Sequence, residues 1–436
     1  MTNERIALEK EAVRITQELI RIPSVNYGEG NGDEKAIADY VQTLLTEVGI
    51  ESKIYESAPN RCNVIARIHG RNSTLPGLVV HGHLDVVPAN ANDWSVDPFA
   101  AVIKEGSIWG RGAVDMKNMD AMILAIVRNW AKTGHRPERD IVLAFFADEE
   151  AGSQFGSRYM TAHHPEVFAG CTEAISEVGG FSVSLSTGKR LYLIEAAQKG
   201  INWMKLTAFG QAGHGSMMNN QNAITQLSEA VAKVGSYQWP QRYTRTVKAF
   251  FKQVASSTDK TYDEADLRPL LKEIGFAARM IGATLQNTAN PTQLDAGYKA
   301  NVIPGEASAI IDGRFLPGFE DELVSTMQEI VGPDIKIETV THDIALEVSF
   351  DGELVDLMCA AIKIHDPEGI PVPYLMSGGT DNKALSELGI KGFGFSPLRL
   401  PADLDFMSLF HGVDERVPIS GIEFGVNVLA DFLESV

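Results

Sequence analysis

The chain has 436 residues, a length typical of two or three domains, and its 44% hydrophobic content is enough for a sizeable core. The formal net charge of −19 argues against nucleic-acid and membrane partners, because nucleic acids and anionic bilayers attract basic surfaces. The three cysteines (Cys62, Cys171 and Cys359) show no C-x-x-C spacing, so neither a disulfide framework nor a zinc knuckle is expected. Cysteine usage therefore predicts a cytoplasmic location.

The first 24 residues carry charges throughout, and their apolar side chains recur at helical spacing. They predict an amphipathic helix that ends before Pro23, and no signal or transit peptide is expected. The longest apolar runs, such as residues 141–147, are too short to span a bilayer.

Apolar segments in the first part of the chain alternate between strand and helix patterns. Strands are expected within residues 62–70, 77–82, 140–150 and 173–180. Apolar residues from Met119 to Trp130 recur at i, i+3, i+4, i+7, i+8 and i+11, which predicts a helix over residues 117–131. Unalternating strands separated by helices favour an α/β fold whose largely parallel sheet is covered on both faces.

The pattern changes near residue 197. Strands are expected at residues 200–210, 291–297, 305–318 and 334–340, and helices at 219–235 and 320–332. The order β-α-β-β-α-β matches a ferredoxin-like α+β unit, here with a long helical and polar insert over residues 236–285. A helix near 353–364 and a strand at 391–397 resume the first pattern. The predicted domains are therefore 1–196 and 345–436 together, with 197–344 inserted between them.

Histidines and carboxylates follow several predicted strands, where open α/β sheets bind their ligands. This set comprises His83, Asp85, Asp115, Asp148, Glu149, Glu150, Glu177 and His411. Each alone is more often a turn residue, a helix start or a structural histidine, but crowded carboxylates repel one another unless cations compensate them. Imidazoles mixed with carboxylates suit zinc or a similar transition metal, and one bridging carboxylate would allow two ions about 3.5–4 Å apart.

Eight motifs in order resemble metallopeptidase family 20, the group of aminoacylases, acetylornithine deacetylases, succinyl-diaminopimelate desuccinylases, glutamate carboxypeptidases and dipeptidases. The motifs are HGHLDVVP (81–88), GSIWGRGAVDMKNMDA (106–121), FFADEEAGSQFGS (145–157), SEVGG (176–180), GHGS (213–216), NVIPGEASAIIDGRF (301–315), SGGTDNKAL (377–385) and FHGVDE (410–415). The resemblance implies a dizinc aminopeptidase-like catalytic domain with an inserted ferredoxin-like lid domain. It also implies two Zn²⁺ per subunit, with Co²⁺ or Mn²⁺ as alternatives.

The resemblance assigns roles by position on the metal side. His83 resembles a ligand of one zinc, Asp115 resembles the bridging carboxylate, and Glu177 takes the place of a ligand of one metal. Glu150 and His411 resemble ligands that share the other zinc. Glu149 resembles the general base, and Asp85 resembles the aspartate that orients His83. His81 has no such role and is interpreted as structural.

Further roles concern the substrate. His214 resembles a histidine that reaches the reacting carbonyl, in dimers often from the partner subunit, and a homodimer through the lid is therefore an expectation. Asn301 and Arg314 resemble residues that hold the substrate carbonyl and carboxylate, and Gly378 and Gly379 a loop whose backbone meets that carboxylate. After GHGS, the sequence MMNNQNAI departs from the Pro-containing turn frequent in the family, which leaves the local lid geometry open.

The implied activity is zinc-dependent hydrolysis of an amide or peptide bond next to a free carboxylate, with a small peptide or N-acyl amino acid as substrate. A dipeptidase or carboxypeptidase is favoured, and an N-acyl-amino-acid deacylase of the aminoacylase kind is the alternative. A dimetal phosphoesterase uses similar ligands, but the Glu149–Glu150 pair and Arg314 argue against it. A non-catalytic metal-binding protein on the same scaffold is a remote alternative, since neither the base nor a ligand is missing.

Overall fold

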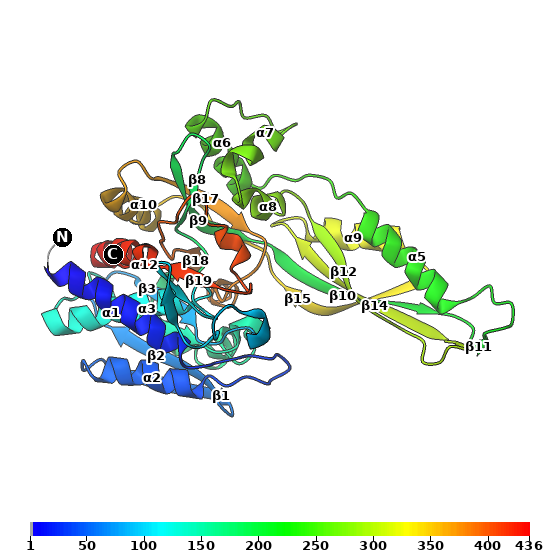
Figure 1. The fold of residues 1–436 in the computed structure, drawn as a ribbon, viewed down its shortest axis with the longest axis horizontal. Helices are drawn as coiled ribbons and strands as arrows, with labels where there is room; N and C mark the ends of the chain where they lie inside the picture. Colours follow the sequence, from blue (N-terminus) through cyan, green and yellow to red (C-terminus); the bar gives the residue numbers. More distant parts are fainter. Residues whose placement is uncertain (1–2) are drawn as a thin grey trace.

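The computed structural model describes residues 3–436, which form a large body and an elongated lid that projects from it (Figure 1). The body contains a ten-stranded sheet of order β1-β2-β6-β3-β7-β18-β9-β16, with β8 and β17 also paired to β9. Its strands are β1 (Ser52–Ala58), β2 (Arg61–Ile68), β3 (Gly77–His83), β6 (Ile141–Phe146), β7 (Cys171–Ser176), β8 (Phe181–Ser184), β9 (Arg190–Gln198), β16 (Leu346–Glu347), β17 (Ile370–Met376) and β18 (Lys391–Gly394).

Parallel pairing lies at the centre of this sheet, and antiparallel pairing toward its edges. Strand β3 runs parallel to β6 and β7, and β7 runs parallel to β18. The sequence predicted a largely parallel sheet, whereas β1 and β2 join β6 in antiparallel fashion and make the sheet mixed. The α/β class is confirmed. Since β3, β6 and β7 run in one direction, their carboxyl ends share one edge, where α/β proteins place their ligands.

Helices cover both faces of the body sheet. Leu78 and Val80 of β3 pack into one core with helix residues such as Ile15 and Met122, whereas Val79 packs into a second core. The first core is formed with α1 (Asn3–Ile20), α2 (Lys35–Thr46), α3 (Lys117–Thr133), α10 (Glu353–His365) and α12 (Ile419–Ser435). The second contains residues of α4 (Ser157–His163) and α11 (Asn382–Ser386). Successive residues of β3 therefore pack into opposite cores. This explains why Leu78, Val79 and Val80 are all apolar and do not alternate with polar residues.

Helix α3 confirms the predicted helix at 117–131 and extends it to Thr133. It ends where Gly134 takes a left-handed backbone conformation with φ of 74°. The helix is buried almost all round because it lies between strand β3 and helices α1 and α12. Its first residue, Lys117, thereby stands directly after the loop that carries Asp115.

The lid comprises residues 200–236 and 288–343. Its elements are β10 (Gly200–Phe209), β11 (Gly213–His214), α5 (Ala223–Ser236), β12 (Thr288–Ala296), β13 (Val302–Ile303), β14 (Glu306–Phe315), α9 (Glu320–Val331) and β15 (Ile335–Asp343). The four long strands form an antiparallel sheet of order β12-β14-β10-β15, which is the expected ferredoxin-like arrangement. Met204, Leu206, Leu227 and Leu323 pack α5 and α9 on one face of this sheet.

The insert between α5 and β12 packs against the body. Helices α6 (Arg245–Ser257), α7 (Arg268–Leu271) and α8 (Ala277–Gly282) contribute Phe250, Phe251, Leu270 and Ile281 to the first body core. Helix α6 contacts β17. The domain boundaries 1–196, 197–344 and 345–436 stay a prediction, but within the middle range residues 245–282 lie on the body.

Buried and paired charges tie the lid to the body where the chain crosses between them. Lys199, between β9 and β10, donates through Nζ to the carbonyl oxygens of Ala283 at 3.1 Å and Gln286 at 2.8 Å. Asp343, at the end of β15, pairs with Arg158 at 2.6 Å and with Lys383 at 3.4 Å. These contacts set the orientation of the lid over the body.

Within residues 3–436, no helix is both long and apolar enough to cross a membrane. Three short strands, β4 (Val102–Lys104), β5 (Ser107–Trp109) and β19 (Arg416–Pro418), form a separate small sheet. It joins the segment before Asp115 to the segment after His411, since Trp109 pairs with Arg416.

Candidate metal centre and cleft

The carboxyl ends of three neighbouring strands bring the candidate ligands together. His83 is the last residue of β3, Glu149 and Glu150 follow β6, and Glu177 follows β7. Asp115 lies in the loop before α3, and His411 in the loop before β19. The sequence prediction that these segments meet at one edge of the sheet agrees with this placement.

Asp115 lies between the two histidines. Its Oδ1 is 3.0 Å from Nε2 of His83, and its Oδ2 is 3.2 Å from Nε2 of His411. Nε2 of His411 is also 3.0 Å from Oε2 of Glu150, and Nε2 of His83 is 3.5 Å from Oε2 of Glu177. The two oxygens of Asp115 therefore face different imidazoles, which is the geometry of a carboxylate that can bridge two cations.

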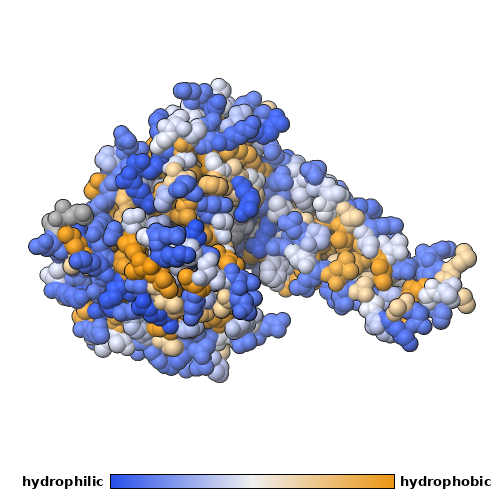
Figure 2. All heavy atoms as spheres, viewed as in Figure 1, coloured by the Kyte–Doolittle hydropathy of each residue, from blue (hydrophilic) through white to orange (hydrophobic). Residues whose placement is uncertain are grey.

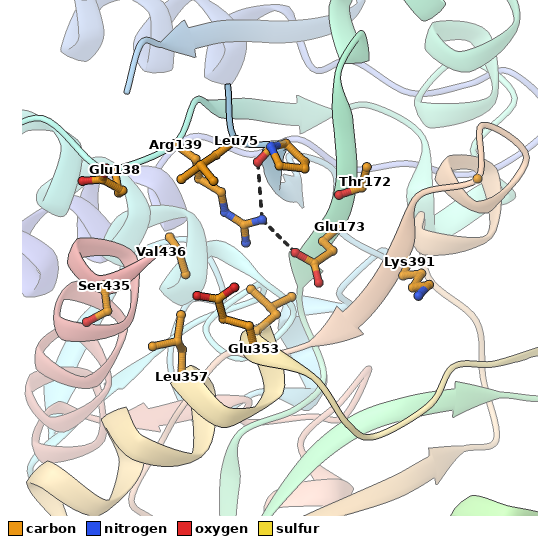
Figure 3. A pocket seen from close by; sticks show the side chains of 13 residues that line it. Leu75, Glu138, Arg139, Thr172, Glu173, Glu353, Leu357, Lys391, Ser435 and Val436 are labelled. Atoms are coloured by element: carbon orange, nitrogen blue, oxygen red, sulfur yellow. Dashed lines mark hydrogen bonds and ion pairs between the residues drawn. The ribbon is translucent and has the colours of Figure 1, made fainter. Parts of the chain in front are cut away.

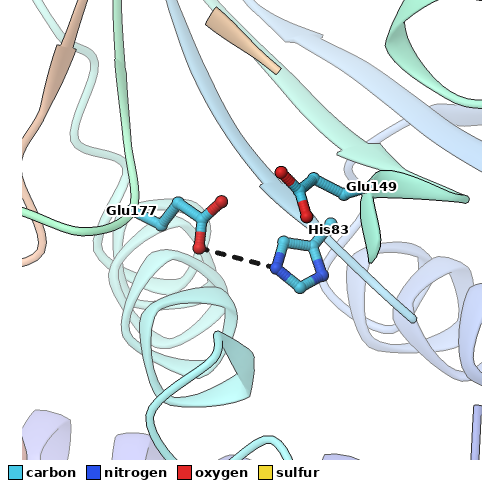
Figure 4. Close-up of side chains that lie close together, drawn as sticks. All are labelled: His83, Glu149 and Glu177. Atoms are coloured by element: carbon cyan, nitrogen blue, oxygen red, sulfur yellow. Dashed lines mark ion pairs between the residues drawn. The ribbon is translucent and has the colours of Figure 1, made fainter. Parts of the chain in front are cut away.

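Two overlapping groups have ligand atoms within 4.8 Å of one another: His83 with Glu149 and Glu177, and His83 with Asp115 and Glu150. Figure 4 shows the first group, in which the Glu149 and Glu177 carboxylates both lie close to the His83 ring and Glu177 is joined to it by the dashed line. The Glu149 carboxylate has no hydrogen-bond or ion-pair partner among the described residues. It is therefore free to act on a molecule in the cleft.

The carboxylates of this cluster lie close together and away from water, and this shifts the pKa values of the cluster. Burial raises the pKa of Glu177 to about 8, opposed by His83 and reinforced by Asp115. Burial, with Glu177 beside it, also raises the pKa of Glu149. Hydrogen bonds that His411 donates to Asp115 and Glu150 raise the pKa of His411 to about 10. Without a cation, the cluster takes up protons to relieve its negative charge.

Asp85 acts on both His83 and the turn that carries Glu149. Nδ1 of His83 lies 2.9 Å from the backbone carbonyl oxygen of Asp85 and 3.6 Å from its carboxylate. That carboxylate accepts hydrogen bonds from the backbone N–H groups of Glu149 at 3.1 Å and Glu150 at 3.2 Å. The main-chain carbonyl of Asp85 thus makes the closer contact to the ring, while its carboxylate fixes the turn that carries Glu149.

A series of buried, hydrogen-bonded side chains supports the turn that carries Glu149. The Asn26 side-chain amide donates to Asp85 at 2.9 Å and to Asp148 at 3.0 Å. Arg61 donates to Asp148 at 2.7 Å and is held in turn by Glu34 at 2.7 Å. All five side chains are buried, so each carboxylate has its charge compensated or hydrogen-bonded, as buried charges require.

A second buried carboxylate holds the loop of Asp115. Glu415 accepts hydrogen bonds from the backbone N–H groups of Gly112 at 3.1 Å, Val114 at 2.8 Å and Asp115 at 3.2 Å. Its charge is paired with Arg111 at 2.7 Å. Because Glu415 lies four residues after His411, one side chain links two ligand-bearing loops.

Left-handed backbone conformations recur beside the ligands. Asp148, Val178 and His411 have φ of 66°, 52° and 57°, although none is a glycine. Such conformations are costly for β-branched and other L side chains, and they persist where surrounding contacts hold them. Here they occur in the three turns that aim Glu149, Glu177 and His411 at one point.

A cleft of about 710 Å³ opens between the ligand cluster and the lid. Figure 2 shows the hollow between the two units. Glu149, Glu150 and His411 line it on one side, and Arg314 of β14 lines it from the lid. Gly378 and Gly379 also line it; a Cβ on Gly379 would come within 2.7 Å of Lys383.

The sequence profile of the peptidase family M20/M25/M40 matches residues 79–435. Human aminoacylase-1 is 25% identical over 446 residues, covering 100% of this chain and 98% of its own. A probable carboxypeptidase S-like 2 of Dictyostelium discoideum is 28% identical over 373 residues, covering 80% of this chain and 70% of its own. The structure of the dipeptidase Dug1p of Saccharomyces cerevisiae superposes with a TM-score of 0.74 at 16% identity, covering 99% and 96% of the two chains.

This chain belongs to peptidase family M20/M25/M40. It is therefore a hydrolase of the metallopeptidase and amidohydrolase type, as the sequence predicted. The superposition confirms the architecture of a catalytic body with an inserted lid.

Two sequence candidates lie far from the cluster. His214 is in β11 and Asn301 precedes β13, and these short strands pair at the outer tip of the lid (Figure 1). Both residues are exposed, and Nδ1 of His214 lies 2.9 Å from Oγ of Ser216. They are neighbours, since the N–H of Gly215 donates to the carbonyl oxygen of Asn301 at 2.9 Å, but neither lines the cleft of its own chain.

Three supporting residues were not anticipated from the sequence: Asn26, Arg61 and Glu415. Glu415 stands within the motif FHGVDE, so that motif contained a signal for it. Asn26 and Arg61 lie in loop and strand segments whose local pattern contains no sign of their partners. His81 fits its structural interpretation: it is buried, lies 2.9 Å from Asn382, and has its pKa lowered by burial to about 4.

The ligand cluster fits a pair of divalent metal ions. Two imidazoles and the three carboxylates of Asp115, Glu150 and Glu177 supply enough nitrogen and oxygen donors, and Oε1 of Glu150 is buried without a hydrogen-bond partner among the described residues. An unpartnered buried carboxylate oxygen is costly, and coordination would satisfy it. The donor set favours a transition metal over calcium or magnesium because of the histidines.

A second hollow of about 540 Å³ lies at the opposite edge of the sheet (Figure 3). It is lined at the amino ends of the strands by residues such as Arg139, Thr172 and Lys391. Arg139 is committed to an ion pair with Glu173 at 2.7 Å. The hollow contains none of the candidate ligands, so the cleft under the lid is the functional candidate.

Replacing Asp115 tests the bridging geometry. We expect Asp115→Asn to lose at least one of the two metal ions per chain, because the amide is a weaker ligand and carries no charge for two cations to share. Metal content by mass spectrometry after dialysis measures this loss. The exposed Asp403→Asn is the matched control and should bind metal as the unmodified chain does. Full retention of both ions by Asp115→Asn would contradict the bridging assignment.

Proposed function

We propose that this chain is a zinc-dependent hydrolase that cleaves an amide or peptide bond next to a free carboxylate, acting as a dipeptidase or carboxypeptidase. The observation that supports this most is the cleft that holds both Glu149 beside the ligand cluster and Arg314 on the facing wall. An arginine binds a carboxylate through paired hydrogen bonds, and this places the scissile bond between the guanidinium and the ligands.

His83, Asp115, Glu150, Glu177 and His411 would hold two zinc ions, or Co²⁺ or Mn²⁺ in their place. Bound divalent ions of this kind polarise a carbonyl oxygen and acidify water. Glu149 takes the proton of the attacking water and then delivers it to the leaving amine. Burial raises the pKa of the Glu149 carboxyl above its ordinary value, which makes it a stronger proton acceptor. Asp85 positions Glu149 through the turn's backbone.

A deacylase of the aminoacylase kind is the second candidate, because human aminoacylase-1 matches the chain over its whole length. A peptidase that recognises a free amine needs an acidic group in the cleft. Glu29 lines the cleft and is exposed, which supports the peptidase assignment. A deacylase would instead place an acyl chain at that end and gain nothing from Glu29.

The tip of the lid supports a homodimer within this proposal. His214 and Asn301 are exposed beside Met217 and Met218, which are 70% and 96% exposed. In a homodimer that pairs two lids, this tip would deliver His214 and Asn301 to the cleft of the partner. The three cysteines, all unpaired, support a reducing, cytoplasmic setting.

Amino-acid release from a panel of dipeptides and N-acyl amino acids, with zinc-loaded protein, tests the choice between the two candidates. We expect release from dipeptides, and Glu29→Gln should raise KM for dipeptides only. Release from N-acyl amino acids alone would establish the deacylase. Silence across both sets would contradict the proposed function.

Glu149→Gln should lower kcat by roughly a hundredfold to ten-thousandfold, because the amide cannot accept a proton. Metal content should stay at the level of the unmodified chain, which separates loss of the base from loss of a ligand. Steady-state kinetics and metal analysis of the same preparation measure both. A variant with nearly unchanged kcat would rule out the role of Glu149.

Arg314→Ala should raise KM for a free-carboxylate substrate by roughly tenfold to a hundredfold, the range expected for a lost charge-assisted hydrogen bond. A substrate whose carboxylate is converted to a carboxamide provides the control, since its KM should change little. An equal change for both substrates would show that Arg314 acts on the lid fold and not on the carboxylate.

A further inference from the structure

Trp203 is a large aromatic side chain left open to the cleft. It lies on β10, lines the cleft together with Ile201 and Arg314, and is 38% exposed. An aromatic ring that faces a concave site offers a ligand a large, rigid apolar contact area. The ring is not needed for the lid core, which is built on the opposite face of the sheet by Met204 and Leu206.

The indole is fixed in place by the carboxylate that also fixes Arg314. Nε1 of Trp203 donates to Oδ1 of Asp312 at 3.0 Å. Arg314 donates through Nε to the same oxygen at 2.6 Å and through Nη2 to Oδ2 at 3.1 Å. The Nη1 group of Arg314 has no partner among the described residues, so the guanidinium keeps donors for a ligand.

Strand register sets the spacing between the ring and the guanidinium. Trp203 pairs directly with Asp312, and Ile201 pairs directly with Arg314. Trp203 and Arg314 are therefore diagonal neighbours on one face of the lid sheet, with a separation of roughly 7–8 Å. This is the scale of one amino-acid residue, so a carboxylate bound to Arg314 brings the side chain on the same α-carbon to Trp203 and Ile201.

The carboxylates on this wall already have partners. Asp343 is committed to Arg158 at 2.6 Å and to Lys383 at 3.4 Å, and Asp312 is committed to Trp203 and Arg314. The groups left open beside Arg314 are the indole face, the half-buried Ile201 and the exposed Thr341, which pairs with Trp203 across β10 and β15. Across the cleft, Val87 and Pro88 add further apolar surface.

We propose that Trp203 is a specificity-determining residue that selects substrates whose carboxylate-bearing residue has a bulky aliphatic or aromatic side chain. This rests on the proposed hydrolase function and names its substrate class. The indole and Ile201 cover the apolar side chain, while Arg314 holds the adjacent carboxylate. The selection applies equally to a dipeptide and to an N-acyl amino acid, because both present the same residue to this wall.

The test compares two matched substrate series, Gly-X and N-acetyl-X, in which X is Ala, Leu, Phe or Glu. Zinc-loaded unmodified protein should show the highest kcat/KM for Leu and Phe in whichever series it cleaves. Trp203→Ala should raise KM for the Phe substrate about tenfold or more and leave the Ala substrate within about twofold, in the range expected for lost apolar contacts. Trp203→Phe should recover most of the preference.

Tyr237→Ala is the matched control, because Tyr237 is also 38% exposed but does not line the cleft. An equal loss for the Ala and Phe substrates in Trp203→Ala, or a preference of the unmodified protein for Glu, would overturn the proposal while leaving the hydrolase function intact. Failure of the unmodified protein to cleave either series would overturn both.

Discussion

The constraint that shapes the molecule is the crowding of four carboxylates around two imidazoles at the carboxyl end of a buried sheet. Burial raises the pKa values of Glu149, Glu150 and Glu177, so a cation bound at this edge would favour their ionised forms. Burying these carboxylates is unfavourable without a cation, and metal binding would relieve this cost. The same burial raises the pKa of Glu149, which supports the proposed role of this side chain as the general base.

Holding such a cluster requires rigid turns, and these are held by other buried charges. Asp85 and Glu415 each accept hydrogen bonds from the backbone N–H groups of ligand-bearing loops. Each of these carboxylates is in turn paired or hydrogen-bonded, Asp85 by Asn26 and Glu415 by Arg111. Removing one partner would leave an uncompensated buried charge, which is strongly destabilising. Stability and ligand geometry are therefore coupled at this edge of the sheet.

Much of this organisation could be predicted from the sequence, for identifiable reasons. The apolar run at β6 and the periodicity of α3 specify buried elements, and parallel strands must end at a common edge. What the sequence could not supply was the choice of packing partner. The sequence predicts residues 236–285 only as a helical and polar insert, and the structure shows that Phe250 and Phe251 of α6 lie on the body and not on the lid. Asn26 likewise acquires its role from partners 59 and 122 residues away.

The lid separates two tasks along its length. Its base, held by Lys199 and Asp343, presents Arg314 and Trp203 to the cleft of its own chain. Its tip carries His214 and Asn301 beyond the reach of that cleft (Figure 1). A stiff antiparallel sheet cannot bring both ends to one site, so the proposed substrate selection near the base needs only one chain. Any contribution from His214 to the reacting carbonyl must then come from a second copy, which would make turnover, but not carboxylate recognition, depend on assembly.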